Sequence, residues 1–313
     1  MNKPLRLALP LVLVMLLLPF YPAEARNYYL QILTFLFMNV VLAQSYDILD
    51  GTMGYANLGH ITFFGLGAYS FGVFYNMEMP FPVALVMAAG FVAVFAGVMS
   101  YPFFRLRGAY FALATFGLVK LMEYVTENLG AITGGSNGLK IDAGDRTLPV
   151  YFLTLGLAVA VVVASWAVRR SRLGLAMMSI REDEEVARDF GVPTYRVKVQ
   201  ALLISSFFPG VMGALYTWNL NFIDTSQVYG LKIALTPVAM ALLGGSGLVV
   251  GPVIGSVFLY AAEETIWTQL EHLHGAIFGA VVVFTGLFMP GGLARIPWVS
   301  RQLARLGLLE APR

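Results

Sequence analysis

Long apolar runs, separated by short polar connections, make up most of the sequence. A helix needs about 20 mainly apolar residues to cross the hydrocarbon core of a bilayer, and stretches near that length recur along the chain. The predicted spans are residues 1–25, 29–49, 56–75, 81–101, 109–128, 149–168, 198–220, 232–245, 249–266 and 275–290. The pattern therefore predicts an all-α polytopic membrane protein with about ten transmembrane helices.

The first apolar run has two interpretations. Lys3 and Arg6 precede it and Ala23-Glu24-Ala25 follow it, as in a secretory signal with a small-residue cleavage site. The same residues suit a first transmembrane helix that begins in the cytoplasm. We favour an uncleaved helix over residues 1–25, because ten spans then leave both termini on the side that is rich in positive charge.

The positive residues predict the orientation. With residue 1 inside, 15 of the 20 Lys and Arg residues fall in predicted cytoplasmic segments, and only Arg26, Lys140, Arg146 and Lys232 fall in predicted external ones. Cytoplasmic connections of membrane proteins carry an excess of Lys and Arg. We therefore expect residues 169–198 and both termini in the cytoplasm.

Composition leaves no room for a soluble domain. The chain is 58% hydrophobic and 12% charged, and its longest polar stretch, residues 171–198, is far shorter than a usual domain. We interpret residues 1–313 as one transmembrane domain, with residues 169–198 as a cytoplasmic loop within it.

Residues 171–198 carry the signals of a short capped helix. Ser179 and Glu182 have capping-box spacing, and Gly191 followed by Pro193 is typical of a helix end. Glu184 can pair with Arg188 one turn later. A solvated loop is the simpler interpretation of such a charge run, but the caps and the apolar residues just upstream favour a docking surface for a partner.

Two glycine-interrupted segments lie in the two halves of the chain, at residues 54–69 and 244–255. The first five and last five predicted spans run in opposite senses, so paired broken segments predict an inverted repeat with the solute path between the halves. Glycine also lets membrane helices approach closely, which is a purely structural explanation for Gly65. The candidate path residues are Asn39, Asn57, His60, Thr62, Gly65, Thr115, Gly244, Gly245 and Ser246.

Several kinds of chemistry find no support. The sequence has no cysteine, no GxxxxGK[ST] nucleotide-binding motif and no second metal ligand near His60. His272 and His274, two residues apart, are weak evidence for a metal. We therefore expect no metal site, no cofactor bound by this chain and no enzymatic activity. Lys120 and Glu123 are the one charged pair expected inside a span, and we interpret them as structural.

The longest predicted external loop contains Thr133, Gly134, Gly135 and Asn137. Small residues and glycines are ordinary turn chemistry. A run of backbone amides facing outward could equally contact a docking partner, and both interpretations stay open.

Seven sequence blocks resemble one family of transport proteins. They are GYANLGHITFFGLGAY at 54–69, RLRGAYFALAT at 105–115, TGGSNGL at 133–139, SRLGLAMMSIREDEEVARDFGV at 171–192, ALLISSFFPGVMGALY at 201–216, LLGGSGLVVGPVIG at 242–255 and GLFMPGGL at 286–293. Together they are similar to the permease subunits of branched-chain amino acid ABC importers. Two positions, Pro209 and Leu248, depart from the family pattern, and Pro209 could kink its span.

The resemblance implies a type II-like importer fold in a bacterial inner membrane and a coupling helix that docks on an ATPase. The residues it assigns to coupling are Ser179, Arg181, Glu182, Asp183, Glu184, Ala187 and Gly191. The implied partners are a second related permease, two cytoplasmic ATPase subunits that bind ATP and Mg²⁺, and a periplasmic substrate-binding protein.

The same resemblance implies branched-chain amino acids as the solute, with urea or short-chain amides as the alternative. The predicted spans have few fixed charges, which suits a net-neutral solute. A secondary transporter or channel is a more distant alternative, and it would need an intramembrane charged site.

Overall fold

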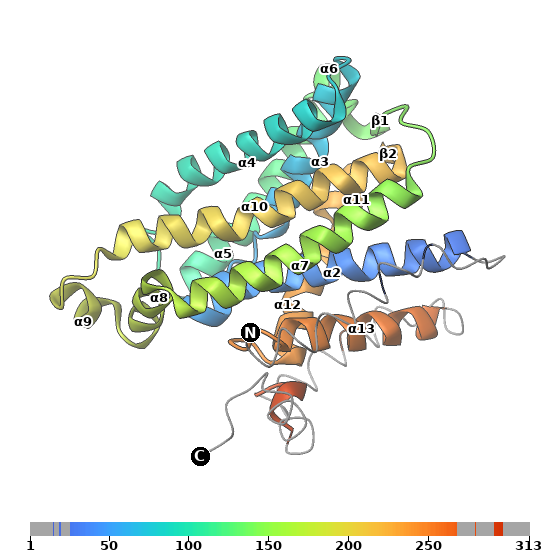
Figure 1. The fold of residues 1–313 in the computed structure, drawn as a ribbon. Helices are drawn as coiled ribbons and strands as arrows, with labels where there is room; N and C mark the ends of the chain where they lie inside the picture. The colour runs from blue at the N-terminus through green and yellow to red at the C-terminus, as the bar shows by residue number, and fades with distance from the viewer. Residues whose placement is uncertain (1–14, 16–18, 20–25, 268–278, 280–290, 297–313) are drawn as a thin grey trace.

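A computed structural model describes residues 15, 19, 26–267, 279 and 291–296, and this part of the chain is a bundle of helices (Figure 1). Its elements in chain order are α2 (Arg26–Met53), α3 (Ile61–Asn76), α4 (Phe81–Phe103), α5 (Ala109–Asn128), α6 (Gly130–Thr133), η2 (Gly135–Asn137), β1 (Leu139–Lys140), α7 (Thr147–Arg170), α8 (Arg172–Glu182), α9 (Glu184–Asp189), α10 (Thr194–Leu220), β2 (Phe222–Ile223), α11 (Thr225–Tyr229), α12 (Leu231–Gly244), α13 (Gly251–Trp267) and η3 (Leu293–Arg295).

Every predicted span within the described ranges coincides with a helix. Five helical segments of this part of the chain are long and apolar enough to cross a membrane: α2, α4, α7, α10 and the combined Thr225–Gly244 segment. At 16 residues α3 extends about 24 Å, less than the roughly 30 Å of hydrocarbon. The chain is thus a helical membrane protein, whereas the predicted spans 1–25 and 275–290 lie outside the described residues.

The span predicted at 56–75 begins too early. Residues 54–60 form an irregular segment, and α3 starts only at Ile61. Gly54 has a φ of 77°, a left-handed conformation that stops α2 from continuing. By contrast α10 runs through Pro209 from Thr194 to Leu220 without interruption.

The core of the bundle forms where α10 packs against α3, with α4, α2 and α7 around them. Gly67 of α3 faces the backbone of Gly210 on α10, and Gly213 faces the Phe64 carbonyl in the same way. A Cβ at either glycine would overlap main-chain atoms, so the two helices approach as closely as glycine permits. On the other side of α2, α12 and α13 pack together as a pair.

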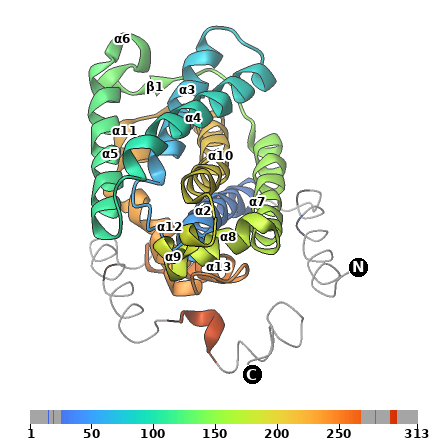
Figure 2. The same ribbon diagram turned by 90° about the vertical axis from the view of Figure 1, so that its left-hand side faces the viewer.

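The connections gather at two ends of the bundle. At one end, which we call the α9 end, lie α8, α9 and the loops 54–60, 104–108 and 245–250; Figure 2 looks onto it. At the opposite end, the β end, β1 pairs with β2 antiparallel. Connections predicted to lie on the same side of a membrane therefore meet at the same end, while the choice of which end faces the cytoplasm stays a prediction.

Candidate functional site

The polar segment at the α9 end consists of two helices rather than one. α8 begins after Ser171, whose Oγ accepts a hydrogen bond from the Gly174 N–H, and it ends at Glu182. α9 begins after Asp183, whose carboxylate accepts hydrogen bonds from the Glu185 and Val186 N–H groups. The predicted capping box is therefore wrong: Ser179 lies inside α8 and its Oγ donates to the Ala176 carbonyl at 2.9 Å. The N-cap is Asp183, because its backbone is extended there.

The predicted end of this segment is confirmed. Gly191 has a φ of 85°, its N–H donates to the Arg188 carbonyl, and the Val192 N–H donates to the Ala187 carbonyl. This is the left-handed ending that favours glycine. Ala187 is buried against the body, whereas the Phe190 side chain is 86% exposed and Val186 lies half-exposed one turn earlier. α9 thus presents an apolar edge to solvent.

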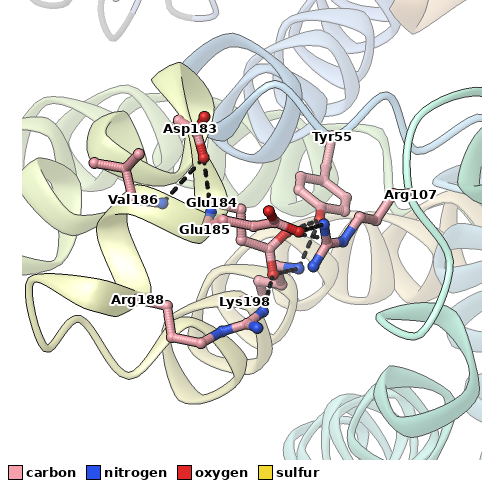
Figure 3. Close-up of polar contacts among 8 residues, drawn as sticks. All are labelled: Tyr55, Arg107, Asp183, Glu184, Glu185, Val186, Arg188 and Lys198. Atoms are coloured by element: carbon pink, nitrogen blue, oxygen red, sulfur yellow. Dashed lines mark hydrogen bonds and ion pairs between the residues drawn. The ribbon is translucent and has the colours of Figure 1, made fainter.

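The carboxylate of Glu184, whose side chain is 11% exposed, ties α9 to the rest of the bundle (Figure 3). Glu184 accepts hydrogen bonds from Lys198 Nζ at 2.6 Å and from Tyr55 Oη at 2.7 Å. Lys198 also donates to Tyr55 Oη at 2.6 Å. Arg107 and Arg188 lie 3.7 Å and 3.5 Å from the Glu184 carboxylate. We call Glu184, Lys198, Tyr55 and Arg107 the Glu184 clasp; it joins α9 to α10 and to two loops.

The clasp keeps Glu184 ionised. Burial alone would raise the pKa of its carboxyl, but the hydrogen bonds from Lys198 and Tyr55, and the charges of Lys198 and Arg107, outweigh it and leave the pKa below its ordinary value. Lys198 is almost fully buried, with its side chain 2% exposed. A buried ammonium needs such a partner. Removing either Glu184 or Lys198 would therefore leave the other charge buried without compensation and would destabilise the protein.

A second polar network lies beside the clasp at the same end. Asp47 of α2, which is fully buried, accepts from Arg169 Nη2 at 2.8 Å, from Ser246 Oγ at 2.9 Å and from the Gly247 N–H at 2.9 Å. Arg181 of α8 donates to the Gly51 carbonyl. This set, the Asp47 junction, connects α2, α7 and α8 to the turn that joins α12 and α13.

The Asp47 junction corrects the charge pattern expected from sequence. Asp47 lies within the span predicted at 29–49, so Lys120 and Glu123 are not the only charged residues of a predicted span that form an ion pair, although Arg169, the partner of Asp47, follows the span predicted at 149–168. Lys120 and Glu123 do pair, at 2.6 Å, but with half of the lysine side chain exposed. Sequence reasoning missed Asp47 because its partner Arg169 lies 122 residues away.

The candidate path residues separate into two groups. Most have structural tasks: the Asn57 carboxamide accepts from the Gly59 N–H, Thr115 Oγ1 and Asn39 Nδ2 donate within their own helices, and Ser246 belongs to the Asp47 junction. Gly244 lies against the Gly251 backbone and Gly245 has a φ of 114°. These glycines form the turn between α12 and α13.

The second group lies on or next to α3 and is less well paired. His60 is buried, with Nε2 at 2.9 Å from Ser45 Oγ and no partner on Nδ1 among the described residues. Thr62 Oγ1 is also buried and unpaired within that part of the chain. Gly65 faces the ring of Tyr229 on α11. Within the described ranges, no group of three or more His, Asp or Glu residues could hold a metal ion.

The loop that follows α5 is an ordered turn. Thr133 Oγ1 donates to the Thr126 carbonyl at 2.6 Å, and Gly134, Gly135 and Gly138 all have positive φ values. Thr133 and Gly135 are buried, whereas Asn137 is exposed. The glycines are therefore explained by turn geometry, and a docking role for Asn137 stays a prediction.

Comparison with known proteins identifies the family. The sequence model of the family "Branched-chain amino acid transport system / permease component" matches residues 28–286. The permease protein LivM of the high-affinity branched-chain amino acid transport system of Escherichia coli K12 is 25% identical, over 94% of this chain and 76% of LivM. LivM of Salmonella typhimurium is 26% identical, over 87% of this chain and 71% of the relative.

A second group of relatives transports a different solute. The autoinducer 2 import system permease protein LsrC of Escherichia coli O9:H4 is 24% identical, over 82% of this chain and 76% of LsrC. No solved structure matches the chain. These matches are to transport permeases and indicate no enzyme. Because the family match covers most of the sequence, this multi-pass inner-membrane protein belongs to the permease family of branched-chain amino acid transport systems.

Proposed function

We propose that the chain is the permease subunit of an ATP-driven importer and that it passes branched-chain amino acids. In this proposal the bundle pairs with a second, related permease, two cytoplasmic ATPase subunits supply the energy, and a periplasmic binding protein delivers the solute. The family and the LivM relatives support import of branched-chain amino acids. The sequence has no GxxxxGK[ST] nucleotide-binding motif, which is consistent with ATP hydrolysis by another subunit.

The observation that carries the proposal is the design of α9. A helix of six residues is too short to be stable alone, yet α9 is capped at both ends and held by the Glu184 clasp. It still leaves Phe190 and Val186 exposed. An apolar edge on a rigid, clasped helix suits a docking surface for an ATPase subunit. The Asp47 junction would carry a displacement of α8 to α2, α7 and the α12–α13 turn.

The solute class follows from the charge pattern of the spans. Asp47 and Arg169 are paired with each other, and the predicted spans contain few other charged residues that could compensate a strongly ionic solute. A net-neutral zwitterion with an apolar side chain fits such a path, and so does urea or a short amide. The LsrC relatives favour autoinducer 2 as a further candidate.

The test is uptake into vesicles that hold both permeases and both ATPases, with the cognate binding protein outside. Labelled leucine should enter only with ATP, and excess unlabelled isoleucine should abolish its entry while glutamate and lysine barely compete. Entry of urea or autoinducer 2 without leucine would replace the solute assignment. Entry without ATP would favour a secondary transporter or a channel and contradict the importer.

The docking role of α9 is tested on the same vesicles with Phe190→Ser. We expect lower recovery of the ATPase subunits with the purified permease and reduced uptake. Met77→Ser is the control, because Met77 is also strongly exposed but lies at the β end. Equal ATPase recovery for the two variants would contradict docking on α9.

A further inference from the structure

Two buried tyrosines face each other between α3 and α11, and their hydroxyls have no hydrogen-bond partner among the described residues. Tyr69 of α3 and Tyr229 of α11 stack with their rings nearly parallel, 4° apart, and with centroids separated by 6.2 Å. Both side chains are buried, and neither hydroxyl has a hydrogen-bond partner among the described residues. Thr126 of α5 comes near the Tyr229 hydroxyl, but not in hydrogen-bonding geometry.

Such hydroxyls are expensive to bury. A buried polar group without a partner costs about 1–3 kcal/mol, and phenol hydroxyls usually find a partner when they are buried. Many buried hydroxyls of the bundle are paired, as Thr217 shows by donating to the Ala68 carbonyl one residue before Tyr69. Two adjacent exceptions on facing helices indicate a place where the partner is supplied by something else.

The face of α3 next to the tyrosine pair leaves room for the Tyr229 ring. Gly65, one turn before Tyr69, has no side chain, and any Cβ there would overlap the Tyr229 ring. Thr62 lies one further turn toward the α9 end, on the same face of α3 because residues seven apart nearly superimpose along a helix. Its Oγ1 is also buried without a partner among the described residues. Thr62, Gly65 and Tyr69 thus share one face of α3, on which two buried hydroxyls lack partners within the described part of the chain and the glycine makes room for the Tyr229 ring.

Two carboxylates flank the pair on the side of the β end. Glu127 of α5 accepts a hydrogen bond from Thr225 Oγ1 at 2.8 Å, and Asp224 caps α11 by accepting from the Gln227 N–H at 2.9 Å. Both are close enough to act electrostatically on Tyr69. Hydroxyl donors next to carboxylate acceptors match a solute that carries an oxygen acceptor at one end and N–H donors at the other.

We propose that Tyr69 and Tyr229 form a solute-binding position in the translocation path. Their hydroxyls donate to the carboxylate or carbonyl oxygen of the solute, and Glu127 and Asp224 face its N–H groups. The inference rests on the proposed import function and deepens it by naming the binding residues. α5 lies at the edge of the bundle and packs on α11 (Figure 2), so its displacement opens the pair to the solute.

The test compares uptake and folding in the complete importer reconstituted in vesicles. The double variant Tyr69→Phe/Tyr229→Phe keeps both rings and removes only the hydroxyls. We expect uptake of labelled leucine, at saturating loaded binding protein, to fall about tenfold. ATP hydrolysis and the unfolding temperature should not fall, because the lost hydroxyls bind nothing within the described part of the protein. Tyr75→Phe, the same change near the C-terminal end of α3, is the control and should leave uptake unchanged.

Unchanged uptake in the double variant would overturn the binding position. If the unfolding temperature fell at the same time, the hydroxyls would have a structural role, such as holding a water molecule. If the wild-type importer shows no ATP-dependent uptake, the proposed function fails, and the site is decided by fluorine NMR instead. A 3-fluorotyrosine at position 229 of the full chain, in complex with the partner permease, should shift on titration with leucine or urea; no shift with either overturns the site.

Discussion

The Glu184 clasp and the Tyr69–Tyr229 pair treat buried polar groups in opposite ways. In the clasp, the carboxylate of Glu184 has partners from α10 and two loops, so its burial is compensated. In the tyrosine pair, two phenol hydroxyls are buried with no partner in the described chain. A fully paired network has one preferred arrangement and resists displacement. An unpaired site has lost its hydration without replacement, and it gains most from a ligand.

The difference between the clasp and the tyrosine pair indicates that the two parts of the bundle have different functions. At the α9 end, the clasp and the Asp47 junction connect five helices, α2, α7, α8, α9 and α10, through paired charged groups. The tyrosine pair, farther toward the β end, has two buried hydroxyls without a partner among the described residues. Proposed energy transfer at one end and proposed solute binding at the other therefore rest on two kinds of polar chemistry, which substitutions can separate.

The largest expected effect concerns the Asp47 junction. Asp47→Asn leaves the Arg169 guanidinium buried beside a neutral group, and breaking a buried ion pair in this way typically destabilises a protein by about 3–5 kcal/mol. Thermal unfolding in detergent measures the loss. Glu123→Gln is the matched control, since its pair with Lys120 is half-exposed and such pairs contribute about 1 kcal/mol or less. Equal losses for the two variants would contradict the role of the junction.

The next effect concerns the Glu184 clasp. Glu184→Gln removes a charge that accepts two short hydrogen bonds, each worth about 1.5–3 kcal/mol when a charge takes part. Hydrogen exchange over residues 184–189 should accelerate by about a hundredfold, while α2 and α10 stay protected. Glu185→Gln is the control, because the Glu185 side chain is mostly exposed. Similar exchange in both variants would show that the clasp does not hold α9.

The clasp also has a predicted pH dependence. Because the pKa of Glu184 is lowered in the folded state, its stabilising contribution is complete above the ordinary glutamate pKa of about 4.3 and is lost as the pH falls through the lower folded value. Exchange over α9, corrected for its intrinsic pH dependence, should therefore be constant above about pH 5. A release of α9 between pH 6 and 8 would contradict this assignment.

A smaller effect separates the tyrosine pair from ordinary packing. Gly65→Ala places a methyl group against the Tyr229 ring, and overpacking of this kind costs about 1–3 kcal/mol. Uptake should fall because the ring can no longer lie against α3. Gly117→Ala is the control: no atom lies within 4 Å of a Cβ there, and alanine stabilises a helix by about 1 kcal/mol relative to glycine. A stable, active Gly65→Ala variant would show that the close approach is dispensable.

The smallest effect tests which residue begins α9. Asp183→Ala removes both hydrogen bonds of the N-cap and should destabilise α9 by about 1 kcal/mol. Ser179→Ala should change almost nothing, because its hydroxyl donates only within α8. Hydrogen exchange of residues 184–189 measures both. A larger effect for Ser179→Ala would restore the capping box expected from the sequence.

The N-cap of α9 could not be predicted from the sequence alone. Ser179 and Glu182 have the spacing of a capping box, but so do residues inside a helix, and local spacing cannot tell the two apart. Gly191 was predictable, because a glycine followed by Pro193 leaves few alternatives. The spans were also predictable where hydrophobicity decides them, whereas the start of α3 depends on the conformation of residues 54–60.

The site residues were harder to predict because their partners are distant in sequence. Tyr55 contacts residues 129 and 143 positions away, and Asp47 contacts residues up to 200 positions away. No local pattern marks such contacts. Gly65 could be singled out as part of a glycine-rich segment. Its contact with Tyr229 could not be predicted, because it depends on the packing of α11 against α3.

The most direct test of separate coupling and solute-binding sites is the amount of leucine imported per ATP hydrolysed in reconstituted vesicles, compared between two variants. Tyr69→Phe/Tyr229→Phe should lower this ratio while ATP hydrolysis stays stimulated by the loaded binding protein, because α9 remains clasped. Glu184→Gln should lower stimulated hydrolysis and uptake together, because a loosened α9 weakens the docking of the ATPase. Loss of stimulated hydrolysis in the tyrosine variant, or an unaltered rate and ratio in both, would contradict the separation of coupling from solute binding.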